Sequence, residues 1–253
     1  MAAAPELIRP QWPAPAGILA LSTTRPGGCS EPPYDSFNLG AHVGDDPAHV
    51  QANRDLLASV LPPGTVVPWL EQVHGVDVVP AERAAPGTRA DAVWTRTPGY
   101  ACAVMTADCL PVLFCTTAGD CVAAAHAGWR GLLGGVLEAT IEAMAVPGSQ
   151  LLAWLGPAIG PAVFEVGAEV RTAYLEAATD AEHEFTASCF RPSSEQRYLA
   201  DLYSLARQRL ARCQVTRVSG GDACTFTDDG RFFSFRRDGA TGRMVSLVML
   251  GKT

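Results

Sequence analysis

Residues 102–131, CAVMTADCLPVLFCTTAGDCVAAAHAGWRG, contain three short apolar runs separated by turn residues. The runs Cys102–Met105, Leu110–Cys115 and Val122–His126 have the length and composition of buried β-strands. The turn TTAGD between the second and third runs indicates that these two strands are antiparallel neighbours. An aspartate and a cysteine stand side by side where the second run begins, which is an unusual place for two reactive side chains.

The same patterns continue on both sides of this stretch. Further strands are expected at Gly17–Thr23, Val76–Pro80, Leu151–Leu155, Val215–Ser219, Arg231–Phe235 and Met244–Leu250. Asp46-Pro47 is typical of an N-cap followed by the first residue of a helix, and apolar residues recur at helical spacing from Leu133 to Met144. Two more helices are expected at about 167–178 and 201–213. Because the strands cluster rather than alternate with helices, we expect an α+β fold with mixed sheets.

Composition limits the kind of protein. The chain has 253 residues, of which 48% are hydrophobic, so we expect a single folded domain spanning residues 1–253. A net charge of -7 gives no broad basic surface for nucleic acid. No apolar run has the roughly 18 residues of a membrane span. The first residues, MAAAPELIRPQWPAP, carry Glu6 and several prolines where a signal peptide needs an apolar stretch, so a cytoplasmic location is expected.

Three possible metal ligands lie at predicted strand ends. His74 occurs in EQVHG, His126 occurs in VAAAHAGWRG, and Cys109 begins its strand directly after Asp108. Two imidazoles and one thiolate leave a fourth tetrahedral position open, which is the arrangement of a catalytic zinc site. The alternatives stay open, because a lone cysteine in a strand is usually a small hydrophobic residue and the ligand spacings match no short zinc motif.

Other polar residues have both a functional and a structural interpretation. Arg25 in TTRPGG could bind an anion or could be a solvated turn residue. Asn38 and His42 precede the first helix, where polar residues commonly cap turns. Asp108 could orient a histidine, take up a proton or simply accept backbone hydrogen bonds.

The motifs EQVHG, TADCLPV and HAGWRG together resemble the YfiH family, also labelled multicopper polyphenol oxidase, laccase-domain or peptidoglycan editing factor proteins. SFNLGAHVGDDPAHVQANR and FFSFRRDGATGR are also similar to family patterns, so the resemblance extends over nearly the whole chain. It implies a four-layer α/β/β/α arrangement of mixed sheets. It also implies zinc ligands at His74, Cys109 and His126, with copper as the less favoured metal.

The activity that the resemblance implies is phosphorolysis of adenosine, inosine, guanosine or methylthioadenosine, together with deamination of adenosine. For deamination, zinc would activate water for attack on C6 of the purine. No HxE motif supplies the usual glutamate, so Asp108 is the predicted proton shuttle beside Cys109. For phosphorolysis, Arg25 is the predicted catalytic and phosphate-binding residue, and Asn38 or His42 would contact the ribose or base.

Three other functions fit the same residues. Cys109 could be the nucleophile of a cysteine hydrolase or amidase acting on peptidoglycan precursors, with His126 or His74 as its base. A copper-dependent polyphenol oxidase needs a further histidine-rich cluster. The histidines left for such a cluster are His42, His49 and His183, which are too few, so this function is the least favoured of the three. A non-catalytic module with a structural metal is the third possibility. The expected partners are a nucleoside and phosphate, and the expected state is a monomer or weak homodimer.

Overall fold

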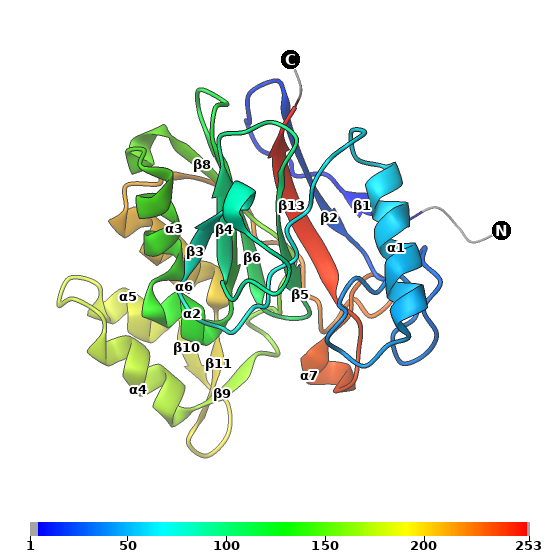
Figure 1. Cartoon of the computed structure of the whole chain (residues 1–253). Coiled ribbons are helices and arrows are strands. Elements are labelled where there is room, and N and C mark those ends of the chain that lie inside the picture. Colours follow the sequence, from blue (N-terminus) through cyan, green and yellow to red (C-terminus); the bar gives the residue numbers. More distant parts are fainter. Residues whose placement is uncertain (1–4, 252–253) are drawn as a thin grey trace.

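Two β-sheets face each other in the computed structural model, which describes residues 5–251 (Figure 1). The six-stranded sheet has the order β12 (Arg217–Gly220), β8 (Leu151–Leu155), β6 (Leu110–Thr116), β7 (Val122–Ala127), β4 (Ala92–Thr95) and β3 (Val78–Pro80). The four-stranded sheet has the order β1 (Leu7–Ile8), β2 (Ile18–Thr23), β13 (Met244–Leu250) and β5 (Ala101–Thr106). The first sheet is mixed and the second is antiparallel.

The alternation of side chains along β6 shows how the layers pack. Leu113 and Cys115 point toward the four-stranded sheet and join a core that includes Val104 of β5. Val112 and Phe114 point the other way, toward the helices. Because successive side chains of a strand lie on opposite faces, a strand buried on both faces is a continuous apolar run. The apolar run that begins at Leu110 therefore forms the centre of the molecule.

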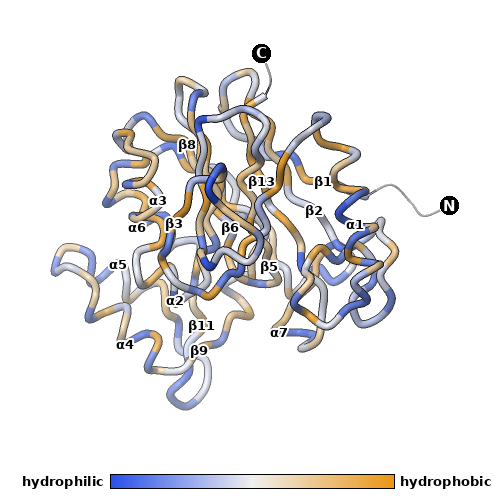
Figure 2. The backbone as a smooth tube through the Cα atoms, in the orientation of Figure 1, coloured by the Kyte–Doolittle hydropathy of each residue, from blue (hydrophilic) through white to orange (hydrophobic). Residues whose placement is uncertain are grey.

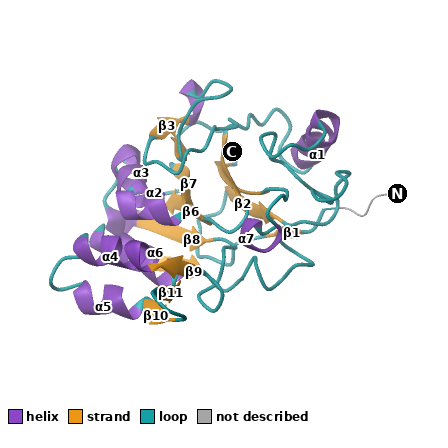
Figure 3. Cartoon of the chain, turned by 90° about the horizontal axis from the view of Figure 1, so that it is seen from below, coloured by secondary structure: helices purple, strands orange, loops and turns teal. Residues whose placement is uncertain are grey.

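Helices cover the outer faces of both sheets (Figure 3). On the four-stranded sheet lies α1 (Pro47–Ser59), whose Leu57 belongs to the same hydrophobic core as Leu247. On the six-stranded sheet lie α2 (Trp129–Gly134), α3 (Val136–Met144) and α6 (Leu202–Arg212). Figure 2 shows hydrophobic residues along the central strands and hydrophilic residues on the outer helices and loops.

The remaining elements lie at the edges of this core. A small antiparallel sheet contains β9 (Glu165–Gly167), β10 (Phe190–Pro192) and β11 (Arg197–Ala200). Beside it lie α4 (Ala168–Glu176) and α5 (His183–Ser188), as Figure 1 shows. Two short 3₁₀ helices span Ala81–Arg83 and Gly148–Gln150, and α7 spans Phe235–Asp238.

Most sequence predictions of the elements are confirmed, including the α+β class and the antiparallel pairing of β6 with β7. Asp46 caps α1, since its carboxylate accepts a 2.8 Å hydrogen bond from the backbone N–H of Ala48. The helix expected after GWRG is divided into α2 and α3 by Gly135, whose φ is 100°. β4 was not predicted because its four residues are too few to show a clear pattern.

The strand predicted at Arg231–Phe235 is wrong. Phe232 and Phe233 are buried in a loop, where they pack with Met244 in a small satellite core, and Phe235 begins α7. An apolar run shows that side chains are buried but not that the backbone pairs with a neighbour.

Two sequence arguments involve the ends of the chain. Residues 1–4, which belong to the segment used to argue against a signal peptide, lie outside the described residues. Over residues 5–251, every helix is too short or too polar to cross a bilayer.

Residues 107–109 carry the chain from one sheet to the other. β5 ends at Thr106 in the four-stranded sheet, and β6 begins at Leu110 in the six-stranded sheet. β13 begins opposite the end of β5, because Met244 pairs with Thr106. β7 ends opposite the start of β6, because Ala127 pairs with Leu110. Side chains from four strand ends therefore meet at one edge of the molecule.

Candidate metal centre

His74, Cys109 and His126 converge at this edge, and we call them the His–Cys–His cluster. Their ligand atoms all lie within 4.8 Å of one another, and His74 Nε2 is 3.8 Å from Cys109 Sγ. In a tetrahedral zinc site with ordinary bond lengths, neighbouring N and S ligand atoms are about 3.5 Å apart. The donor set and its spacing therefore fit zinc with three protein ligands and one open position.

Asp91, directly before β4, contacts the ring of His126 and the backbone of His74. It is fully buried and its carboxylate lies 2.8 Å from Nδ1 of His126, which leaves Nε2 of that ring free to face the cluster. The same carboxylate accepts backbone N–H groups from Val73, His74 and Gly75 at 3.2, 2.9 and 2.6 Å. A carboxylate behind a ligating histidine fixes the tautomer and orientation of the ring. Asp91 therefore holds the His74 loop and the His126 ring in one geometry.

Each charged group of the cluster shifts the pKa of its neighbours toward the ionised form. Burial raises the pKa of the Cys109 thiol, but His126 and His74 outweigh burial and bring this pKa to about 6. Burial lowers the pKa of His126, but the Cys109 thiolate and Asp91 outweigh it and raise this pKa. Burial also raises the pKa of Asp91, and hydrogen bonds from His126 and the Gly75 N–H reverse the shift. Cys109 is therefore a thiolate at neutral pH, the form that binds metals and attacks electrophiles.

The backbone around the cluster is unusual. His74 has a φ of 61° and Asp108 a φ of 94°, both in the left-handed region that residues other than glycine rarely occupy. Such conformations concentrate at functional sites, where surrounding contacts hold them. Gly128, the N-cap of α2, lies so close that a Cβ there would be 2.9 Å from Cys109 Sγ and 3.0 Å from His74 Cδ2. Glycine at this position lets α2 begin against the cluster.

Two adjoining pockets open onto the cluster. The first, of about 300 Å³, is lined by His42 and Arg243 beside all three members of the cluster, and we call it the Arg243 pocket. The second, of about 230 Å³, is lined by Trp129 and Phe164, and we call it the Trp129 pocket. His74, Cys109 and Phe235 line both pockets. A ligand lying over the cluster can therefore extend to either side.

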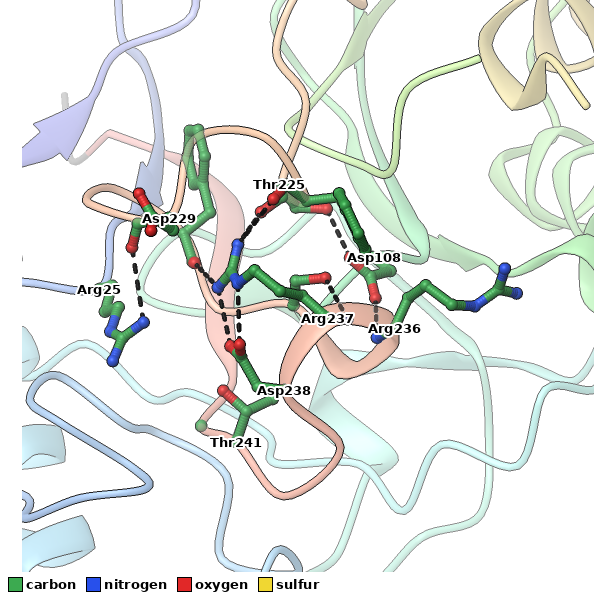
Figure 4. A network of polar contacts seen from close by, with 12 residues as sticks. Arg25, Asp108, Thr225, Asp229, Arg236, Arg237, Asp238 and Thr241 are labelled. Atoms are coloured by element: carbon green, nitrogen blue, oxygen red, sulfur yellow. Dashed lines mark hydrogen bonds and ion pairs between the residues drawn. The ribbon is translucent and has the colours of Figure 1, made fainter. Parts of the chain in front are cut away.

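Asp108 lies in the wall of the Trp129 pocket and is almost fully buried. Its carboxylate accepts 2.6 Å hydrogen bonds from Thr225 Oγ1 and from the backbone N–H of Arg236. Figure 4 shows this carboxylate between the two residues, in a network that continues to Arg237 and Asp238. These contacts join the segment before β6 to Thr225 and to α7.

Arg25 and Asn38 lie away from the place where the sequence prediction put them. Arg25 lines a separate pocket, and its guanidinium is paired with the Asp35 carboxylate at 2.8 Å (Figure 4 shows Arg25 beside Asp229). Asn38 is fully buried, and its amide binds backbone groups of Gly40 and Arg243 and the Asp45 carboxylate. Its polar atoms are occupied by the protein, so it shapes the loop rather than facing either pocket. His42, by contrast, lines the Arg243 pocket together with the His–Cys–His cluster.

Sequence reasoning missed Asp91 and Arg243. Asp91 stands directly before β4, whose neighbour in the sheet is β7, the strand of His126. Arg243 stands directly before β13, whose first residue pairs with the end of β5. In both cases a charged residue next to an apolar strand was the available signal. The strand order that brings these residues to the cluster cannot be read from one sequence.

The sequence is similar to one protein family and to its curated members over nearly its whole length. The family described as multi-copper polyphenol oxidoreductase laccase matches residues 19–251. The purine nucleoside phosphorylase YfiH of Escherichia coli is 56% identical over 248 residues, covering 97% of this chain and 99% of that protein. A purine nucleoside phosphorylase of Pseudomonas aeruginosa is 55% identical over 244 residues, covering 96% of this chain and 98% of that protein.

Solved structures agree. The Neisseria meningitidis protein NMB0706, assigned to DUF152, has a TM-score of 0.91 and 50% identity, covering 97% of this chain and 99% of its own. YlmD of Geobacillus stearothermophilus has a TM-score of 0.88 and 31% identity, covering 100% of this chain and 98% of its own. The family match spans residues 19–251, and the similarity to these relatives and solved structures covers at least 96% of this chain, so the chain belongs to the YfiH family of laccase-domain proteins.

Proposed function

We propose that this protein is a zinc-dependent purine nucleoside phosphorylase that also deaminates adenosine. The proposed substrates of phosphorolysis are adenosine, inosine, guanosine and methylthioadenosine. The observation that carries the proposal is an open three-ligand cluster between two pockets, in a chain whose relatives are named purine nucleoside phosphorylase. We further expect a cytoplasmic monomer or weak homodimer.

Zinc is preferred to copper on the basis of the donor set. One thiolate and two imidazoles suit zinc, and a copper oxidase of phenols needs a second, histidine-rich cluster to reduce oxygen. Among residues 5–251, the His–Cys–His cluster is the one group of three or more His, Cys, Asp or Glu residues with metal-binding spacing. The description of the family as a laccase therefore does not match the ligands in this part of the chain.

Different residues around the cluster are suited to different parts of phosphorolysis. In that reaction a phosphate oxygen forms a bond to C1′ of the ribose while the bond from C1′ to the purine nitrogen breaks. The electron pair leaves with the base, which takes up a proton. Trp129 and Phe164 line one pocket with aromatic side chains suited to a purine, Cys109 and His74 line both pockets, and His126 lines the Arg243 pocket. Zinc held by these three would act as a Lewis acid and lower the pKa of a bound water.

The proposal is tested by incubating the purified, zinc-loaded protein with adenosine, with and without phosphate. We expect adenine and ribose-1-phosphate only when phosphate is present, and inosine in both conditions. Products are followed by chromatography. Absence of all three products would refute the proposal, and inosine alone would limit it to deamination.

A second candidate rests on the Cys109 thiolate, His126 and Asp91. Such a chain of cysteine, histidine and carboxylate is also the machinery of a cysteine hydrolase, here acting on peptidoglycan precursors. Alkylation by iodoacetamide separates the two candidates. If zinc occupies the cluster, Cys109 reacts slowly until a chelator removes the metal, whereas a hydrolase nucleophile reacts at the same rate with and without chelator.

A further inference from the structure

Arg243 carries a positive charge into its pocket, where burial lowers its pKa although the nearby charges of Cys109 and Asp108 act in the opposite direction. Its side chain is partly buried, and no Asp or Glu within residues 5–251 lies within ion-pair distance of its guanidinium. A cation removed from water is costly unless an anion compensates it. We propose that Arg243, together with His42, binds the phosphate co-substrate, an inference that rests on the proposed function.

Hydrogen bonds hold Arg243 in place and leave part of its guanidinium group available to a ligand. The Nη1 group donates to the carbonyl oxygens of Thr241 and Gly242 at 2.9 and 3.0 Å, and Asn38 Oδ1 accepts the backbone N–H at 2.8 Å. Gly40 makes room for the stem, since a Cβ there would lie 2.7 Å from Arg243 Cγ. Within the described chain, Nε and Nη2 have no hydrogen-bonding partner. Two N–H groups side by side match two oxygens of a phosphate.

His42 adds a second donor to the same pocket. Burial, and then the charges of Arg243 and Arg54, lower its pKa, so the ring is neutral and can donate one hydrogen bond. Arg54 is itself occupied, because it donates to the Leu39 carbonyl oxygen and stacks on Trp69 at 3.9 Å. Hydrogen bonds therefore hold the loop that carries His42. Arg54 binds Leu39 before it, and Asn38 binds Asp45 after it.

The opposite pocket is better suited to the base than to phosphate. Arg130 stacks on Trp129 at 4.5 Å, and Arg236 stacks on Phe164 at 5.4 Å and donates to the Glu165 carbonyl oxygen. Both arginines are exposed to solvent and engaged by neighbours, so neither is a buried cation in need of an anion. With phosphate at Arg243 and purine at Trp129, the attacking oxygen and the departing base lie on opposite sides of the ribose. Displacement at C1′ requires this arrangement.

The matched pair Arg243→Gln and Arg25→Gln tests the assignment, because Arg25 is the arginine that sequence reasoning favoured for the same task. In Arg243→Gln we expect the KM for phosphate in inosine phosphorolysis to rise by about tenfold or more. Arg25→Gln, whose guanidinium lies in a separate pocket, should keep the wild-type KM for phosphate. Arg243→Lys, which keeps the charge but loses the fork, should give an intermediate KM.

Zinc content and Tm are measured for each variant, so that a folding defect is recognised. An unchanged KM for phosphate in Arg243→Gln would overturn the assignment, as would a rise in KM confined to Arg25→Gln. If the wild-type protein forms no ribose-1-phosphate, the proposed function fails on its own. Calorimetric titration of inorganic phosphate into wild type and Arg243→Gln then decides about the site, where equal affinities would refute it and weaker binding by the variant would support it.

Discussion

Asp91 shows how one residue can determine a whole site. A single buried carboxylate binds the ring of His126 and three backbone N–H groups around His74, so the two imidazoles share one support. If either contact were lost, the imidazoles would be less ordered before the metal binds. Ordering them on binding would then cost conformational entropy and weaken the affinity for the metal. We therefore expect Asp91 to contribute to metal affinity although it is not itself one of the three proposed ligands.

Replacement of Asp91 by asparagine tests this support. An amide cannot accept as strongly from His126 and the backbone together, so zinc affinity should fall by about 10–100-fold. Competition with a chromophoric chelator measures the affinity. Asp55→Asn, on the exposed face of α1, is the control and should bind zinc like the wild type. Equal affinity in Asp91→Asn and the wild type would show that the support is not needed.

At this scale the sequence was informative about some residues and silent about others. The three members of the cluster were recognisable as a thiol and two imidazoles at strand ends. Asp91 and Arg243 are an aspartate and an arginine directly before strands, and many such residues are only solvated. The interactions of these two residues depend on which strands are neighbours, and a single sequence does not contain that information.

At the scale of elements, the start of α2 lies directly against the cluster. Gly128 has no side chain, and Cys109 and His74 occupy the space that a Cβ would need. Gly128→Ala should push the two ligands apart, so zinc affinity should fall by about tenfold or more while the sheets stay folded. Gly230→Ala is the control because a Cβ there meets no atom within 4 Å. Wild-type zinc affinity in Gly128→Ala would contradict the close approach.

An ion pair connects α5 with α6. The hydrogen bonds from Arg212 and Thr179 lower the pKa of Glu182 to about 2 from an ordinary value of 4.5. Because the pKa is lowered in the folded state, the stabilisation is present above about pH 4.5 and is lost as the pH falls toward 2. Glu182→Gln should therefore cost up to about 1 kcal/mol at pH 7, as surface ion pairs do, and progressively less as the pH falls below 4.5.

Urea unfolding of Glu182→Gln and wild type at pH 7, 5 and 3.5 measures this difference. Glu176→Gln, at the exposed end of α4, is the matched control and should show no such pH dependence. A stability difference between Glu182→Gln and wild type that is the same at all three pH values would show that the ion pair is not its source.

Strands were predicted correctly where an apolar run pairs with neighbouring strands, and wrongly where it is buried beneath a loop. β6 and β13 are buried on both faces, and their sequences are predominantly apolar runs. Such runs, at this length, predict buried strands. The run around Phe232 is just as apolar, but its side chains fill a small core beneath a loop, without a strand to pair with. Hydrophobicity predicts burial, and backbone pairing depends on partners far away in the sequence.

For the molecule as a whole, the site is a consequence of how the two sheets are connected. The chain leaves the four-stranded sheet at Thr106 and enters the six-stranded sheet at Leu110, and Cys109 lies in the crossing. Both sheets contribute side chains there, with Arg243 from the first and His126 from the second. The fold places the Arg243 guanidinium and the Cys109 thiolate at the same crossing.

The most direct test of the central claim is a titration of zinc into metal-stripped protein, with phosphate-dependent formation of ribose-1-phosphate from inosine as the readout. We expect the rate to rise in proportion to bound zinc and to level off at about one zinc per chain, which is the capacity of a single His–Cys–His cluster. Cys109→Ala should bind no zinc tightly and show no activity. Full activity in the stripped protein, or one bound zinc per chain without any ribose-1-phosphate, would contradict the claim.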